Sequence, residues 1–170
     1  MQLMMQRKRQ EMVKQSQQKA ATSAPSTRDI HLQRDLAKLA GLPRTSELIF
    51  PDPKDLAHFN VILRPDEGIY AGGRFKFSVE VTPEYNMQPP KVHCLTPVFH
   101  PNIDSDGHVC LNILRDEWTP AYDLMAIIVG LLHLFYRPNP DDPLDREAAD
   151  LMRKHPDEFK RRARRSFETR

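Results

Sequence analysis

A histidine, a proline and an asparagine stand together in this sequence, and a cysteine follows eight residues after the asparagine. These residues are His100, Pro101, Asn102 and Cys110. A thiolate is a strong nucleophile, and an asparagine amide can donate hydrogen bonds to the oxyanion of a tetrahedral intermediate. Their combination in one short segment predicts acyl transfer through a sulfur nucleophile.

The backbone between His100 and Cys110 is expected to be irregular. Turn-forming residues fill it, and they interrupt both the helical and the strand period. Cys110 should therefore lie beside a loop, where reactive thiols are usually displayed. The second cysteine, Cys94, shares strand parity with Val92, so we expect it to point into the core as a small apolar residue.

A metal site is the main rival interpretation, because five possible ligands fall within eighteen residues. They are His93, Cys94, His100, His108 and Cys110. Zinc sites usually contain Cys-x-x-Cys or His-x-x-x-His pairs, which let two ligands converge. Neither pair is present here, so the sequence predicts neither a metal nor a cofactor.

Length and composition favour one domain in a reducing compartment. The chain has 170 residues, of which 39% are hydrophobic, and this is enough for one core and a tail. Two cysteines and no signal-like apolar start argue against a disulfide framework. The longest apolar stretch, residues 124–135, is too short to cross a bilayer.

The net charge of +2 is distributed unevenly, with an acidic body between two basic ends. The arginines near the C-terminus could bind nucleic acid. However, Phe159, Ala163 and Phe167 recur among them at four-residue spacing. This spacing favours the solvated face of an amphipathic helix, without a nucleic-acid partner.

Elements on both sides of the active segment are expected to position it. A helix should begin at Thr27 and end near Gly41 and Pro43. Strands are expected at residues 47–50, 60–63, 75–81 and 91–95, and further helices at 124–135, 144–154 and 156–166. The predicted class is α+β, with an N-terminal helix, a four-stranded antiparallel meander, the active-site loop, a central buried helix and two C-terminal helices.

Residues 1–25 have no period that would bury a face in a core, and they predict a flexible extension ahead of a catalytic core at 26–170. The first residues of this extension are nevertheless apolar, and methionine suits adaptable binding surfaces. The apolar residues of this tip are Met1, Leu3, Met4 and Met5.

Several linked motifs make the chain resemble the ubiquitin-conjugating enzymes from about Ser26 to the C-terminus. They are His100-Pro101-Asn102, Val109-Cys110-Leu111, Trp118-Thr119-Pro120-Ala121 and the segment 138–144. The resemblance implies that Cys110 takes a ubiquitin-like modifier from an activating enzyme as a thioester and yields it to a substrate lysine. Because conversion of a thioester to an amide is downhill, this step needs no ATP or metal.

Three further segments are more similar to the neddylating branch, which handles the Nedd/Rub modifier and targets cullins, than to general ubiquitin carriers. They are residues 65–70, 85–92 and 110–115. Asn86 stands where most of the wider family has proline. The resemblance implies as partners a Nedd/Rub-type modifier, its activating enzyme, a RING-type ligase and a cullin substrate, in the cytoplasm and nucleus and with no membrane.

The resemblance also implies roles for individual residues. Asn102 stabilises the oxyanion, Asp142 flanks the incoming lysine, and His100 with Pro101 orders the loop instead of supplying a base. We also expect Asp142 to cap a helix. The ligase-binding residues implied are Met87, Pro120 and Ala121. The helix from Thr27 faces the activating enzyme, with docking by Met1, Leu3, Met4 and Met5.

Two related functions stay open. One is an ordinary ubiquitin-conjugating enzyme of the same fold, which would differ in the modifier that it accepts. The other is a non-catalytic binding variant, although such variants lack the cysteine that this chain has at position 110.

Overall fold

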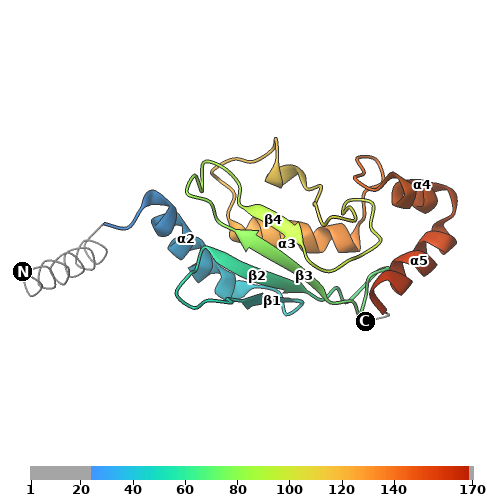
Figure 1. The fold of residues 1–170 in the computed structure, drawn as a ribbon, viewed down its shortest axis with the longest axis horizontal. Helices are drawn as coiled ribbons and strands as arrows, with labels where there is room; N and C mark the ends of the chain where they lie inside the picture. Colours follow the sequence, from blue (N-terminus) through green and yellow to red (C-terminus); the bar gives the residue numbers. More distant parts are fainter. Residues whose placement is uncertain (1–23, 169–170) are drawn as a thin grey trace, which may run out of the picture.

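The computed structural model describes residues 24–168 of the chain (Figure 1). A helix and a 3-10 turn precede a four-stranded sheet, and three helices follow it. The elements are α2 (Thr27–Lys38), η1 (Leu39–Gly41), β1 (Ser46–Ile49), β2 (His58–Leu63), β3 (Phe75–Glu80), β4 (Lys91–Cys94), η2 (Asn112–Leu114), α3 (Leu124–Tyr136), α4 (Arg146–Lys154) and α5 (Pro156–Glu168). The predicted α+β class and order of elements are confirmed.

Helix α2 begins with a capping box. Ser26 Oγ accepts the backbone N–H of Asp29, and the Asp29 carboxylate accepts the N–H of Ser26, which satisfies two free donors of the first turn. Further along the helix, the fully buried Asp35 pairs with Arg34 and accepts a hydrogen bond from the hydroxyl of Tyr85. This contact connects α2 to the loop that follows β3.

The sheet is the predicted antiparallel meander, with strand order β1-β2-β3-β4. Because successive strand residues point to opposite faces, the paired residues collect the apolar side chains on one face. The pairs on this face are Phe59 with Val79, Val61 with Phe77, and Leu63 with Phe75. In Figure 1 helix α3 lies across the sheet, and its residues join these side chains in one core.

Helix α3 is the central helix of the molecule. Asp123 caps its start by accepting the N–H of Ala126, and it ends just ahead of Pro138, as expected for a proline that disfavours helix in the residue before it. The ring of Phe135 stacks on Phe75 with centroids 4.2 Å apart. The expectation of burial on nearly every side is wrong at Val129, which is 46% exposed, because this position faces away from the sheet.

Helices α4 and α5 form the end of the molecule away from α2 (Figure 1). Asp145 caps α4 by accepting the N–H of Ala148, so the expectation that Asp142 caps this helix is wrong. The chain first makes a turn there, in which Pro101 O accepts the N–H groups of Leu144 and Asp145. This turn leaves the Asp142 side chain free for another contact.

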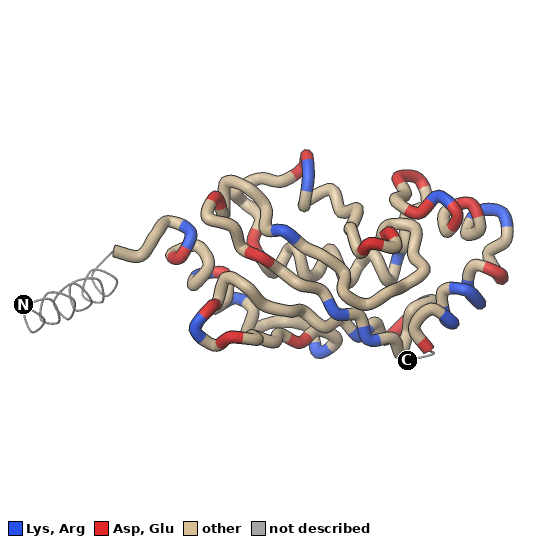
Figure 2. The backbone as a smooth tube through the Cα atoms, in the orientation of Figure 1, with Lys and Arg blue, Asp and Glu red and all other residues tan. Residues whose placement is uncertain are grey.

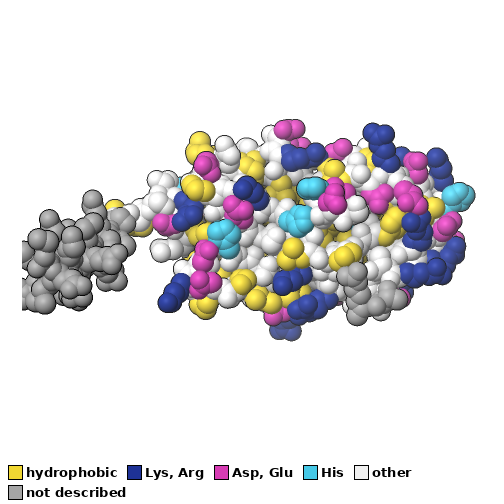
Figure 3. Space-filling view, viewed as in Figure 1, with side chains coloured by type: hydrophobic (Ala, Val, Ile, Leu, Met, Phe, Trp, Pro, Cys, Tyr) yellow, Lys and Arg dark blue, Asp and Glu magenta, His cyan; other side chains and the backbone are white. Residues whose placement is uncertain are grey.

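The predicted amphipathic character of α5 is confirmed. Phe159 and Ala163 are buried, whereas Lys160, Arg161 and Arg164 are exposed. Figure 2 shows this basic stretch along α5, and Figure 3 shows Lys and Arg side chains on the surface over α4 and α5. Within residues 24–168 no helix is long and apolar enough to cross a membrane.

Candidate active site

The segment from His100 to Cys110 folds back on itself. Isolated bridges pair Ile103 with His100 and with Val109, and the N–H of Cys110 donates to Asn102 O over 2.8 Å. The reversal uses Gly107 at φ +88°, where a Cβ would lie 2.2 Å from Cys94 O, so no larger residue fits without displacement. The sequence thus places Cys110 beside Asn102 through local backbone contacts.

His100 holds this segment and is fully buried. Its Nε2–H donates to Leu134 O in α3 over 2.9 Å, and its Nδ1 accepts the N–H of Asn102 over 2.9 Å. Burial lowers the pKa of His100 to about 4, because desolvation disfavours the charged imidazole. Both ring nitrogens bond to backbone atoms, so the ring has no lone pair left to act as a general base.

Asn102 joins the active segment to the loop between α3 and α4. Its Nδ2 donates to Asn139 O over 2.8 Å and to Asp142 O over 3.3 Å, and its Oδ1 accepts the N–H of Asn139 over 2.8 Å. In this structure the amide therefore supports the backbone near Cys110. Stabilisation of an oxyanion would use the donor that makes the longer bond, and this role stays a prediction.

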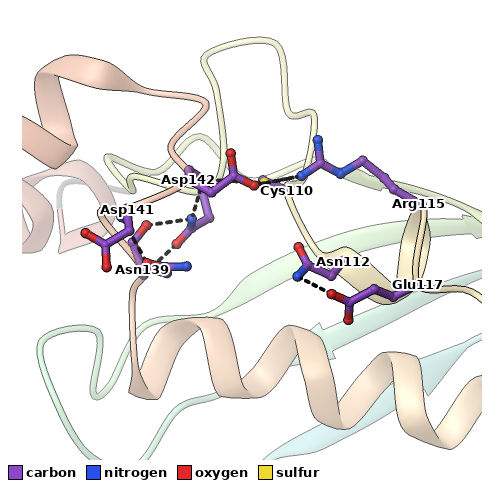
Figure 4. A network of polar contacts seen from close by, with 8 residues as sticks. Cys110, Asn112, Arg115, Glu117, Asn139, Asp141 and Asp142 are labelled. Carbon is purple, nitrogen blue, oxygen red and sulfur yellow. Dashed lines mark hydrogen bonds and ion pairs between the residues drawn. The ribbon is translucent and has the colours of Figure 1, made fainter.

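The Cys110 sulfur lies between an acidic and a basic side chain (Figure 4). Its Sγ is 3.3 Å from Asp142 Oδ2 and 3.5 Å from Asp142 O, and Nη2 of Arg115 is 2.7 Å from the sulfur. Burial raises the pKa of the Cys110 thiol first, and the hydrogen bond to Asp142 raises it further, whereas the Arg115 charge lowers it. Asp142 thus adjoins Cys110, and its expected role beside an incoming lysine stays a prediction.

A hollow of about 350 Å³ opens beside the sulfur. Besides Cys110, Asn102 and Asp142, its lining comprises Leu111, Asn112, Ile113, Glu117, His133, Leu134, Arg137 and Asn139. The apolar residues Leu111, Ile113 and Leu134 and the polar residues of this lining suit an extended peptide end. A thiol at its edge can then reach a carbonyl carbon presented there.

Cys94 has the surroundings of a core residue. It is 5% exposed, and its Sγ donates to Thr96 O over 3.2 Å. Burial raises its pKa to about 11, so the thiolate form is scarce at neutral pH. Cys94 and both nitrogens of His100 are bonded to the backbone, and the absence of a metal site stays a prediction.

The loops carrying the expected ligase-binding residues are joined to each other. Asn86 Nδ2 donates to Pro120 O over 2.9 Å, and Trp118 Nε1 donates to Asn86 O over 2.9 Å. A proline at position 86 could not make the first bond. Met87 is 73% exposed, and Pro120 and Ala121 are exposed next to it in the fold. The structure thus brings these three residues to one surface, whose partner stays a prediction.

Met1, Leu3, Met4 and Met5 lie outside the described residues, whereas α2 presents the exposed Ile30. Sequence reasoning missed Arg115 and Asn139 as site residues. Arg115 follows the short turn η2 five residues after Cys110, and this spacing was the only signal that it could return to the sulfur.

Comparison with known proteins identifies the family to which the chain is similar. The family model for ubiquitin-conjugating enzymes matches residues 31–167. The chain is 46% identical over 154 residues to the Nedd8-conjugating enzyme UbcE2M of Drosophila melanogaster, spanning 91% of this chain and 82% of that protein. It is 49% identical over 136 residues to the NEDD8-conjugating enzyme UBC12 of Saccharomyces cerevisiae, spanning 76% and 72%.

A solved structure gives the same result for the fold. The Ubc12 structure from S. cerevisiae superposes with a TM-score of 0.80 at 43% sequence identity. The match covers 93% of this chain and 88% of that one.

Proposed function

Because this chain belongs to the ubiquitin-conjugating enzyme family, we propose that it accepts NEDD8, the Nedd/Rub modifier, from an activating enzyme and transfers it to a substrate lysine. Family membership makes the chain a transferase for ubiquitin-like modifiers. The choice of NEDD8 is supported by relatives that are NEDD8-conjugating enzymes at 46% and 49% identity.

In the first half-reaction the Cys110 thiolate attacks the thioester carbonyl that joins the modifier to the activating enzyme. A new carbon–sulfur bond forms at Cys110, and the thiolate of the activating enzyme leaves and takes up a proton. The hollow beside Cys110 would receive the extended C-terminus of the modifier. Asn102 would donate to an oxyanion mainly in the second half-reaction, when the lysine attacks.

In the second half-reaction the neutral amine of a lysine attacks the Cys110 thioester. An amide forms, Cys110 leaves as a thiolate, and the excess proton on the amine passes to solvent or to Asp142. Asp142 is well placed for this step because its carboxylate lies 3.3 Å from the sulfur and is exposed. The carboxylate can orient the approaching lysine from the solvent side.

One observation carries this proposal. The Cys110 sulfur borders a hollow and contacts Asp142 and Arg115, while the neighbouring His100 is committed to the backbone at both nitrogens. A cysteine protease needs an imidazole base beside its thiol. Exchange between thioesters needs only a thiolate, which fits the arrangement found here.

The partners follow from the same proposal. A RING-type ligase would contact Met87, Pro120 and Ala121, and the activating enzyme would contact α2 and the apolar tip of the N-terminal extension. Cullins would be the substrates, in the cytoplasm and nucleus.

A charging assay tests the function directly. The full chain is incubated with ATP and either the NEDD8 or the ubiquitin activating enzyme, each with its own modifier, and the thioester is scored by its sensitivity to a thiol reductant. We expect charging with NEDD8. Cys110→Ser should give a thiol-resistant oxyester that hydroxide cleaves, and the matched Cys94→Ala variant should still charge.

Two results would overturn the proposal. Charging that survives Cys110→Ala would remove Cys110 as the nucleophile. Preferential charging of the intact chain with ubiquitin would replace NEDD8 by ubiquitin and make the chain an ordinary ubiquitin-conjugating enzyme.

A further inference from the structure

Arg115 occupies a position that the reaction described above does not use. It caps the end of η2, where its N–H donates to Asn112 O over 2.9 Å, so its backbone is fixed close to the active segment. From there the side chain reaches back to Cys110. Figure 4 shows the guanidinium pointing toward the sulfur and the Asp142 carboxylate.

The Arg115 guanidinium contacts the Cys110 sulfur and the Asp142 carboxylate at the same time. Nη2 donates to Cys110 Sγ over 2.7 Å and forms an ion pair with Asp142 Oδ2 over 3.1 Å. An arginine stays charged at any pH that a protein survives. Cys110, Arg115 and Asp142 therefore form a three-membered cluster around one sulfur atom, in which the arginine carries the only positive charge.

Without the arginine, the surroundings of the sulfur would oppose ionisation. Cys110 is 6% exposed as a residue, and the oxygens in contact with its sulfur belong to a carboxylate and a carbonyl. Both oxygens favour a sulfur that keeps its proton. A positive group in contact with the sulfur is the simplest way in which a buried, acidic environment can still supply a thiolate.

We propose that Arg115 is a further catalytic residue, whose guanidinium stabilises the Cys110 thiolate both when it attacks the incoming thioester and when it leaves after lysine attack. While the sulfur is acylated it carries no charge, so the guanidinium then pairs with Asp142 alone. The ion pair thereby also neutralises a carboxylate that would otherwise favour the protonated, unreactive form of the lysine.

Other charged groups near the sulfur make different contacts. Glu117 accepts a hydrogen bond from Asn112 Nδ2 over 2.9 Å, and His133 and Arg137 line the far part of the hollow. Asp116 lines an adjoining hollow with Arg115 and Asp142. Among the described residues, only Arg115 and Asp142 have a charged side-chain atom in hydrogen-bond contact with Cys110 Sγ.

The test measures the thiolate directly and needs neither modifier nor activating enzyme. The rate of alkylation by iodoacetamide is measured against pH in the full chain carrying Cys94→Ala, so that Cys110 is the one thiol whose alkylation is observed. We expect Arg115→Gln to move the midpoint of the profile upward by about one pH unit, which is about tenfold less thiolate at a given pH. Arg115→Lys should recover part of this shift.

A matched control is available outside the active site. Arg64 is 44% exposed and is paired with Glu47, whereas Arg115 is 46% exposed and is paired with Asp142. Arg64→Gln removes the same charge from a similar ion pair and should leave the alkylation midpoint unchanged. Equal shifts in Arg64→Gln and Arg115→Gln would mean that net charge acts, and would overturn the assignment.

A second pair of variants controls for destabilisation of the fold by an unpaired carboxylate. Arg115→Gln leaves the Asp142 carboxylate without its partner, so the substitution is also made in an Asp142→Asn chain. The proposal requires a higher midpoint in the double variant than in Asp142→Asn alone. An unchanged or lower midpoint in both backgrounds would overturn it.

The inference rests on the proposed function only for the identity of the nucleophile. If charging with NEDD8 fails while Arg115→Gln still raises the alkylation midpoint, the proposed function fails and the role of Arg115 toward the sulfur stands. If charging with NEDD8 succeeds and Arg115→Gln leaves the alkylation midpoint unchanged, the proposed function stands and the role of Arg115 fails.

Discussion

Lowering the pH from about 7.5 to about 5.0 should weaken the fold through a single buried side chain, His100. In the folded chain its pKa is lowered to about 4 by burial, while an unfolded chain has a histidine pKa of about 6.5. Above about pH 6.5 the ring is neutral in both states. As the pH falls below that value only the unfolded chain binds the proton, so stability is lost until the folded pKa is reached.

The size of the effect follows from these two values. At about pH 5.0 the unfolded histidine is almost fully protonated and the folded one is almost neutral, which lowers the free energy of unfolding by about 2 kcal/mol relative to about pH 7.5. Near pH 4 the loss approaches about 3 kcal/mol. This is a large part of the stability of an ordinary domain, which is about 5–15 kcal/mol.

Urea unfolding at both pH values, followed by circular dichroism and by the fluorescence of the only tryptophan, Trp118, measures this difference. His100→Gln is the comparison, because its amide can donate to Leu134 O without titrating. The variant should start from a lower stability but lose about 2 kcal/mol less between the two pH values. The rest of the chain is the same in both proteins, so its contribution to the pH dependence cancels.

The result that would refute this reasoning is an equal loss of stability in the two proteins. If His100→Gln does not fold, His100→Asn serves instead, because it can still accept the N–H of Asn102. Equal acid sensitivity in that variant would mean that His100 is not kept neutral by the fold.

Three further expectations can be tested. Asn102→Ala removes an acceptor and two donors, so urea unfolding should show that the free energy of unfolding falls by about 2–3 kcal/mol. Single-turnover discharge to lysine should slow about 10²–10³-fold, and charging should slow less. Equal slowing of charging and discharge would contradict an oxyanion role. Gly107→Ala should lower the free energy of unfolding by well over the roughly 1 kcal/mol expected for Gly72→Ala. At Gly107, unlike at Gly72, the new Cβ would lie 2.2 Å from a backbone atom, Cys94 O. Equal urea midpoints for the two variants would contradict this. Removal of residues 1–25 should weaken charging by purified NEDD8 activating enzyme and leave discharge of preloaded protein unchanged; charging at the full rate would remove the tip as a docking segment.

Local patterns determined much of the fold. Strand β3 was predicted within one residue because one buried face imposes strict alternation on residues 75–81. The start of α2 was readable because Ser26 and Thr27 are good caps. The assignment at Asp142 failed because Asp145 has the same chemistry three residues later, and only the turn held by Pro101 O decides between them.

The site itself was only partly readable. Cys110 and Asn102 are only eight residues apart, so their types and spacing were enough to predict that they lie together. Arg115 reaches the sulfur through a 3-10 turn that carries no clear signal, and Asp142 arrives from a loop that is 32 residues away. Such distant contacts depend on how α3 packs on the sheet, which no local pattern specifies.

The hydrogen bonds between Asn102 and the loop after α3 make the site depend on completed folding. Its hydrogen bonds join residues that are 37 and 40 positions apart, and closing a loop of that length costs entropy that the packing of α3 must offset. A misfolded or partly synthesised chain would have the cysteine but neither the hollow nor its charged neighbours. We therefore expect the arrangement of Asn102 and Asp142 around Cys110 to form only in a folded chain.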